Sequence, residues 1–143
     1  MNPTARDECD ELLGSVMPFA IELLTKYGEF YPFGATVSSE GELAHTGGWN
    51  GEEFPESRAL IDLLVRGFQD GAARGLYRAT ALVSDVRVVP PGKNEKQDAI
   101  SVRLDHRADY SVVVMFPYTL DEDNALQLDS PFAIQGDAVI FKN

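Results

Sequence analysis

Few side chains in this 143-residue chain could perform covalent or metal chemistry. The sequence contains one cysteine, Cys9, and two histidines, His45 and His106. Cys9 falls on the apolar side of a predicted helix, where a thiol is expected to be a small buried hydrophobe and not a reactive thiolate. The two histidines lie far apart in the sequence and could share a metal only if their strands were adjacent. We therefore predict no catalytic residue, no metal site and no cofactor.

Acidic side chains are numerous, with 23 Asp and Glu against 12 Lys and Arg and a formal net charge of −11. Their densest group outside the predicted helices is Asp121, Glu122 and Asp123. This group begins like a calcium-binding loop, but Ala125 and Leu126 stand where a ligand and the turn glycine belong. We expect a solvated acidic patch, which would attract a basic partner if it serves more than solubility.

The acidity also argues against two classes of partner. Lysine and arginine are scattered singly, so no basic surface is available for nucleic acid or for anionic lipid headgroups. No apolar run reaches the roughly 20 residues of a membrane-spanning helix, and residues 1–8 include acids where a secretory signal needs a basic start. We expect a cytoplasmic protein that binds another protein or itself, with no nucleic acid and no membrane as partner.

A glycine-rich loop at residues 45–53 is one candidate binding site and contains His45, Trp49 and Glu52. Loops of this composition between a strand and a helix commonly bind ligands, and the helix that follows offers free backbone donors. The loop nevertheless lacks the spacing and the lysine of a nucleotide phosphate loop. It either lines a small-ligand pocket or serves as a connector in which Trp49 covers the core.

The most distinctive segment reads Gly-Glu-Phe-Tyr-Pro-Phe-Gly over residues 28–34. Two interpretations remain open: Tyr31 and Phe33 form a surface for a ligand or partner, or the aromatic side chains fix a strand to the preceding helix. The segment resembles one found in a group of small uncharacterised bacterial proteins. That resemblance covers about half of the chain and implies no activity and no catalytic residue.

Hydrophobic periodicity predicts the elements that position these residues. Residues 4–26 show helical spacing, with a capping box formed by Thr4 and Asp7 and a kink or break near Pro18. A hairpin and then a second helix follow at 30–37, 43–46 and 55–74, and the second helix carries one apolar stripe. Three longer strands and a last, C-terminal strand are predicted at 76–89, 98–106, 110–118 and 137–141.

The predicted order is therefore α-β-β-α-β-β-β plus a C-terminal strand, in a single domain spanning residues 1–143. Such an order fits an α+β fold in which an antiparallel sheet of about five strands carries both helices on one face. In element order it resembles the profilin-like or roadblock-like arrangement, which is shared by proteins of many functions.

We interpret the chain as a non-catalytic protein-binding or regulatory module. It would bind and neutralise a basic partner, or it would bind a second copy of itself to form a homodimer. The alternative, from a different class, is a small-ligand sensor or an enzyme with a pocket near the 45–53 loop.

Overall fold

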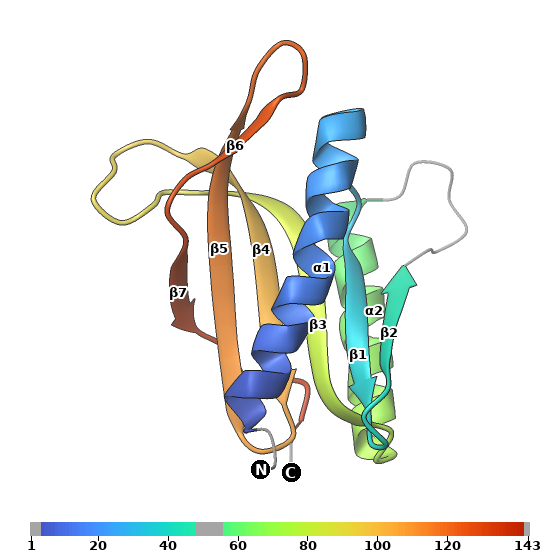
Figure 1. Cartoon of the computed structure of the whole chain (residues 1–143). Coiled ribbons are helices and arrows are strands. Elements are labelled where there is room, and N and C mark those ends of the chain that lie inside the picture. Colours follow the sequence, from blue (N-terminus) through green and yellow to red (C-terminus); the bar gives the residue numbers. More distant parts are fainter. Residues whose placement is uncertain (1–3, 48–55, 142–143) are drawn as a thin grey trace.

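The computed structural model of the chain describes residues 4–47 and 56–141, which form two helices and seven strands (Figure 1). The helices are α1 (Ala5–Tyr27) and α2 (Ser57–Ala73). The strands are β1 (Phe33–Ser38), β2 (Leu43–Gly47), β3 (Tyr77–Val88), β4 (Gln97–His106), β5 (Tyr110–Leu120), β6 (Leu126–Leu128) and β7 (Phe132–Gln135). The α+β class and the predicted order of elements are confirmed.

All seven strands belong to one open antiparallel sheet, in which the strand order is β2-β1-β3-β4-β5. Two short strands then share the far edge of β5. β6 pairs with Tyr118–Leu120, and β7 pairs with Val112–Met115. The prediction of about five strands was too low, because runs as short as β6 and β7 give little periodic signal.

Helix α1 begins and ends as the sequence predicts. The Thr4 side chain accepts a hydrogen bond from the Asp7 N–H, and the Asp7 carboxylate accepts one from the Thr4 N–H in return. At the other end Gly28 adopts a left-handed conformation with φ 79°, and its N–H donates to the Leu24 carbonyl at 2.8 Å. Pro18 lies inside the helix, which continues past it to Tyr27. Neither α1 nor α2 combines the length and apolarity that a membrane-spanning helix requires.

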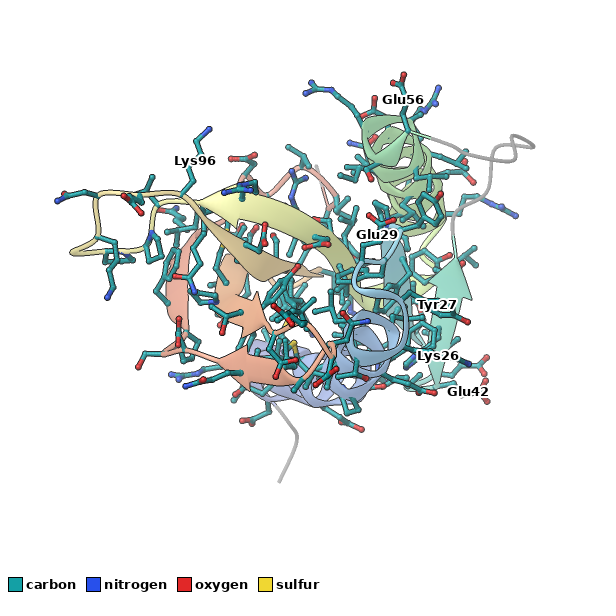
Figure 2. The ribbon with its side chains drawn as sticks, turned by 90° about the horizontal axis from the view of Figure 1, so that it is seen from above. Lys26, Tyr27, Glu29, Glu42, Glu56 and Lys96 are labelled. Atoms are coloured by element: carbon teal, nitrogen blue, oxygen red, sulfur yellow. The ribbon has the colours of Figure 1, made fainter. Side chains whose placement is uncertain are left out.

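The two helices lie on opposite faces of the sheet, which corrects the prediction that both pack on one face (Figures 1 and 2). Strand side chains alternate between faces, so β3 directs Ala81 and Val83 toward α1 and Leu82 toward α2. A Cβ added to Gly34 of β1 would lie only 2.6 Å from the Phe68 ring of α2. The absence of a side chain at Gly34 therefore lets α2 pack closely on β1. The central strands are consequently buried on both faces.

The apolar stripe of α2 packs as predicted, with Leu60, Leu64 and Phe68 all buried. The predicted C-terminal strand at 137–141 is wrong. The final strand, β7, ends at Gln135, and the following residues form an irregular segment in which Ala138 has a positive φ of 54°. This segment still docks on the α2 face, where Ile140 is buried.

Three hydrogen bonds outside the sheet ladder hold that C-terminal segment. The Gly136 N–H donates to the Ser111 carbonyl at 3.1 Å, and the Ala138 N–H donates to the Ser111 hydroxyl at 3.2 Å. The Gln69 side chain donates to the Val139 carbonyl at 2.9 Å. The apolar residues of this segment therefore pack on the core, as the sequence predicted, but the segment does not pair with a strand.

Candidate functional site

A groove of about 710 Å³ lies where α1 ends and the chain turns into β1. Its lining is mostly aromatic and apolar, and consists of Phe19, Leu23, Tyr27, Phe30, Tyr31, Pro32 and Phe33. Gly47 and Ser57 contribute from β2 and α2, and two carboxylates, Glu29 and Asp85, complete it. Small-molecule sites commonly measure about 300–1,000 Å³, so the groove is large enough to bind a side chain or a small ligand.

Each of the two interpretations that the sequence left open fits some of the aromatic residues before β1. Phe30 and Phe33 are buried, and their rings lie 5.7 Å apart in an edge-to-face arrangement. Phe33 also meets Phe19 edge to face at 4.9 Å. Tyr31 and Tyr27, in contrast, are 51% and 62% exposed. The phenylalanines therefore fix the segment to the core, while the tyrosines face outward beside the groove.

Glu29 and Asp85 make the groove negative. Figure 2 views this end of the molecule and shows Lys26 beside Tyr27, with Lys96 far away on the projecting β3–β4 loop. The Lys26 Nζ lies 5.4 Å from the centroid of the Tyr27 ring, so this tyrosine already has a cation of the chain near it. Within the described part of the chain, no basic side chain forms an ion pair with either carboxylate of the groove. The groove thus offers negative charge beside exposed aromatic rings.

Asp85 is held in place by Tyr118, whose hydroxyl donates to its Oδ1 at 2.6 Å. Partial burial raises the pKa of Asp85, the bond from Tyr118 lowers it, and the charges of Asp98 and Glu29 raise it further. Burial also raises the pKa of Tyr118, and the neighbouring carboxylate adds to that rise. Ionised Asp85 is therefore costly in the folded chain, and a cation entering the groove would relieve that cost.

His45 lies beside the groove on β2, where its Nε2 is 2.7 Å from the Ser15 hydroxyl and its ring is 6.3 Å from Phe19. The residue is exposed, as is all of β2. His106 is far from it, because β1 and β3 separate β2 from β4. The condition under which the two histidines could share a metal is therefore not met. Within the described ranges, no group of three or more potential metal ligands occurs.

The other members of the predicted loop site, Trp49 and Glu52, lie outside the described residues. Gly47 and Ser57, which line the groove, belong to the two elements on either side of residues 48–55. Of the five side chains singled out from the sequence as binding candidates, Tyr31 and Phe33 line the groove and His45 lies next to it.

The acidic patch Asp121, Glu122 and Asp123 forms the exposed turn between β5 and β6. Asp121 partly serves the fold, because its Oδ1 accepts hydrogen bonds from the backbone N–H groups of Asp123 and Ala125 at 2.8 and 2.9 Å. The turn adjoins the end of α1, since the Asn124 side chain would lie 3.6 Å from a Cβ on residue 28. The patch and the groove therefore share one end of the molecule.

At the opposite end of α1 a carboxylate has a closed environment. Glu8 accepts a hydrogen bond from His106 Nε2 at 3.0 Å and lies 3.5 Å from the Arg78 guanidinium. The His106 Nδ1 accepts the Ala108 N–H at 3.0 Å, so the proton of the neutral ring resides on Nε2 and points to Glu8. This cluster is structural, since all of its polar groups have partners inside the fold.

Cys9 follows Glu8 of that cluster in the sequence, and its side chain is buried, with 1% exposed. Burial raises the pKa of its thiol to about 12, and the negative charges of Asp105, Asp10 and Glu8 contribute. The burial of Cys9 confirms the prediction of a buried side chain, and the raised pKa favours the protonated thiol at neutral pH.

Sequence reasoning missed the two carboxylates of the groove and Phe19. One signal was present for Asp85, because it continues the alternation of Ala79, Ala81 and Val83 on the face that packs against α1. A carboxylate in phase with core residues on a strand is a sign of a special environment. No comparable signal marked Glu29, whose position depends on how the turn after α1 folds.

The chain matches no protein-family model, and no curated protein or solved structure shows significant similarity to it. The resemblance of the residue 28–34 segment and the profilin-like or roadblock-like arrangement therefore stay predictions from the sequence.

Proposed function

We propose that this chain is a non-catalytic binding module that takes a lysine or arginine side chain of a partner protein into the aromatic groove. The observation that carries the proposal is the pair of carboxylates, Glu29 and Asp85, in a groove whose other lining is mostly aromatic and apolar. Within the described residues neither carboxylate is neutralised by an ion pair.

Lysine and arginine match both properties of this groove. Their aliphatic stems bury well against apolar surface while the charged end stays polar. A cation near the face of a tyrosine or phenylalanine gains about 0.5–2 kcal/mol, with more gained when water is excluded. The carboxylates of Glu29 and Asp85 then pair with the charge. The net charge of −11 attracts a basic partner before contact is made.

A binding role is better supported than a catalytic one. The Cys9 thiol has a pKa raised to about 12, and His106 uses both ring nitrogens in structural hydrogen bonds. The remaining described histidine, His45, contacts the Ser15 hydroxyl at 2.7 Å, but within the described residues no carboxylate is hydrogen-bonded to its ring to complete a catalytic triad. We propose a cytoplasmic location, in keeping with a fold that relies on packing without an internal disulfide.

A second candidate function is binding of a small organic cation at the same place. The volume of about 710 Å³ supports it, because that size is typical of small-molecule sites. Both candidates require the same charge pattern, but a protein partner would extend beyond the groove.

Selection from a library of random nine-residue peptides displayed on phage tests the proposal directly. We expect the retained peptides to share a lysine or arginine flanked by aliphatic or aromatic residues. A synthetic peptide of that kind should bind Glu29→Gln about tenfold more weakly than the unchanged protein, because one charge-assisted contact is lost. Glu95→Gln is the matched control, since it makes the same change of charge on the β3–β4 loop.

Enrichment of peptides without basic residues would contradict the proposal, as would equal binding by Glu29→Gln and Glu95→Gln. Binding of a free alkylammonium ion as tight as that of the peptide would favour the small-ligand function instead.

A further inference from the structure

The strand next to the groove, β2, lies at one end of the strand order of the described sheet. Within the part of the chain that the structure describes, β2 pairs with β1 and with no other strand. Its five residues, Leu43 to Gly47, are all exposed and include neither a charged side chain nor a proline. Proteins commonly block a free strand edge with such residues or with a bulge. In β2 the edge is left able to pair.

The register identifies which backbone groups face outward. Ser38 donates its N–H to the Glu42 carbonyl at 2.8 Å, so positions 38 and 42 form a hydrogen-bonded pair. Bonded and non-bonded pairs alternate along antiparallel strands. Val37–Leu43, Ala35–His45 and Phe33–Gly47 are therefore non-bonded pairs. It follows that residues 43, 45 and 47 direct their N–H and C=O groups away from β1.

These outward groups lead into the groove. Gly47 lines the groove itself, and His45 lies beside Phe19, which also lines it. His45 is opposite Ala35, whose side chain belongs to the core beneath α1, so both side chains are on the α1 face. A strand added outside β2 would place every second side chain on that same face, at the height of the groove.

The geometry points to β-strand addition as the mode of binding: an extended, basic segment of a partner protein pairs with the outer edge of β2 and inserts a lysine or arginine into the groove. This inference rests on the proposed function and adds the conformation and the register of the partner. Backbone pairing supplies affinity in such complexes, and pockets for alternate side chains supply specificity.

Charge decides between a basic partner and a second copy of this chain as the occupant. β2 begins directly after Glu42, and Glu40 lies two residues before that. At the other end of β2 the groove contains the carboxylates of Glu29 and Asp85. A basic strand meets attraction at both ends. A second copy, carrying the same net charge of −11, would set like charges against each other.

Fluorescence anisotropy with a labelled heptapeptide of alternating valine and lysine tests the inference. His45→Pro removes the outward N–H at that position but none of the bonds to β1, and proline is tolerated in this way on edge strands. We expect His45→Pro to bind the peptide about five- to tenfold more weakly than His45→Ala, the control that loses the same side chain but keeps the N–H. Thermal melting of both variants checks that each is folded.

A second measurement keeps the unchanged protein and alters only the peptide. Methylation of alternate backbone nitrogens, those facing β2, preserves the charge of the heptapeptide but removes its strand donors. We expect at least a tenfold loss of affinity, since several backbone bonds fail together. Methylation of the other set of nitrogens, which face away from β2, should be tolerated.

The outcomes separate the two proposals. If Glu29→Gln weakens binding but His45→Pro and backbone methylation do not, the cation site stands and strand addition is overturned. If methylation abolishes binding but Glu29→Gln has no effect, strand addition stands without the groove. A peptide that never binds, together with a dimer in sedimentation that His45→Pro dissociates, would overturn the basic partner in favour of a second copy.

Discussion

Carboxylates occur at both ends of α1, but in different surroundings. Near its first turn, Glu8 receives hydrogen bonds or an ion pair from His106 and Arg78, and its side chain is 13% exposed. Near its last turn, Glu29 and Asp85 line an open groove and are not ion-paired with any basic residue that the structure describes. The site at Glu8 is completed by the fold, whereas under the proposed function the site at Glu29 and Asp85 is completed by a bound cation.

The comparison shows how to separate structural from binding carboxylates in a chain with 23 of them. A buried acid with internal partners contributes to stability, and its loss leaves those partners unsatisfied. An acid whose ionised form is disfavoured by the fold costs stability, and such a cost is typical of positions kept for function. Removal of a charge should therefore destabilise the fold more at the closed site than at the open site.

The largest expected effect is at the closed site. Glu8→Ala should lower the free energy of unfolding by about 2–4 kcal/mol, because it leaves His106 and Arg78 without their acceptor in a largely buried position. Glu29→Ala should change it by less than about 0.5 kcal/mol. Urea denaturation of both variants measures this difference. Equal losses would mean that the groove carboxylate is also structural.

The next effect concerns association of the open end with a basic partner. The on-rate for the valine–lysine heptapeptide in stopped flow should fall about fivefold or more between roughly 50 and 300 mM salt, because screening removes steering by the net charge of −11. Dissociation should change less.

Neutralising the acidic turn should reproduce part of that salt effect at constant ionic strength. The replacement is Asp121→Asn, Glu122→Gln and Asp123→Asn together. The double variant that leaves residue 121 unchanged is the control, since Asp121 also holds its own turn. An on-rate indifferent to salt and to both variants would mean that the acidity serves solubility alone.

A smaller effect concerns stability and pH at Asp85. Because burial raises the pKa of Asp85 above its unfolded value, the folded chain holds this proton more tightly than the unfolded chain. Stability contributed by the protonated form is thus lost as the pH rises from the unfolded toward the folded pKa. Asp85→Asn should lose less stability over that range while still accepting from Tyr118. Melting temperatures of both proteins from about pH 3.5 to pH 7 test this prediction. Parallel curves would contradict it.

The smallest expected effect is that of metal removal. Dialysis against a chelator should leave the melting temperature unchanged, because among the residues that the structure describes neither carboxylate site joins enough ligands for a structural metal. A fall of many degrees in the melting temperature, restored by zinc or calcium, would show that the open site binds a metal ion. It would overturn the assignment of that site to lysine or arginine.

Local features of the fold could be predicted because their causes are local. The capping box of Thr4 and Asp7 depends on residues three apart in the sequence. The stripe of Leu60, Leu64 and Phe68 depends on the helical repeat, and all three are buried as predicted.

Features that depend on the choice of face could not be predicted in this way. An apolar stripe shows that α2 packs on the sheet but not on which side, and that choice rests on Gly34 leaving room for Phe68. The run Val139–Phe141 was known to be apolar, yet its backbone leaves the extended conformation at Ala138. The edge position of β2 likewise depends on the strand order, which no single segment encodes.

Neighbouring residues and composition account for the α+β class, the order of elements, the helix ends and the acidic character. Only the packing of distant segments gives Glu8 a basic partner and leaves Glu29 and Asp85 without an ion pair among the described residues. Glu29 and Asp85 lie far apart in the chain and come to line one groove only after α1, β1 and β3 have packed. Whether a carboxylate stabilises the fold or is available to a cation depends on the groups that surround it in space.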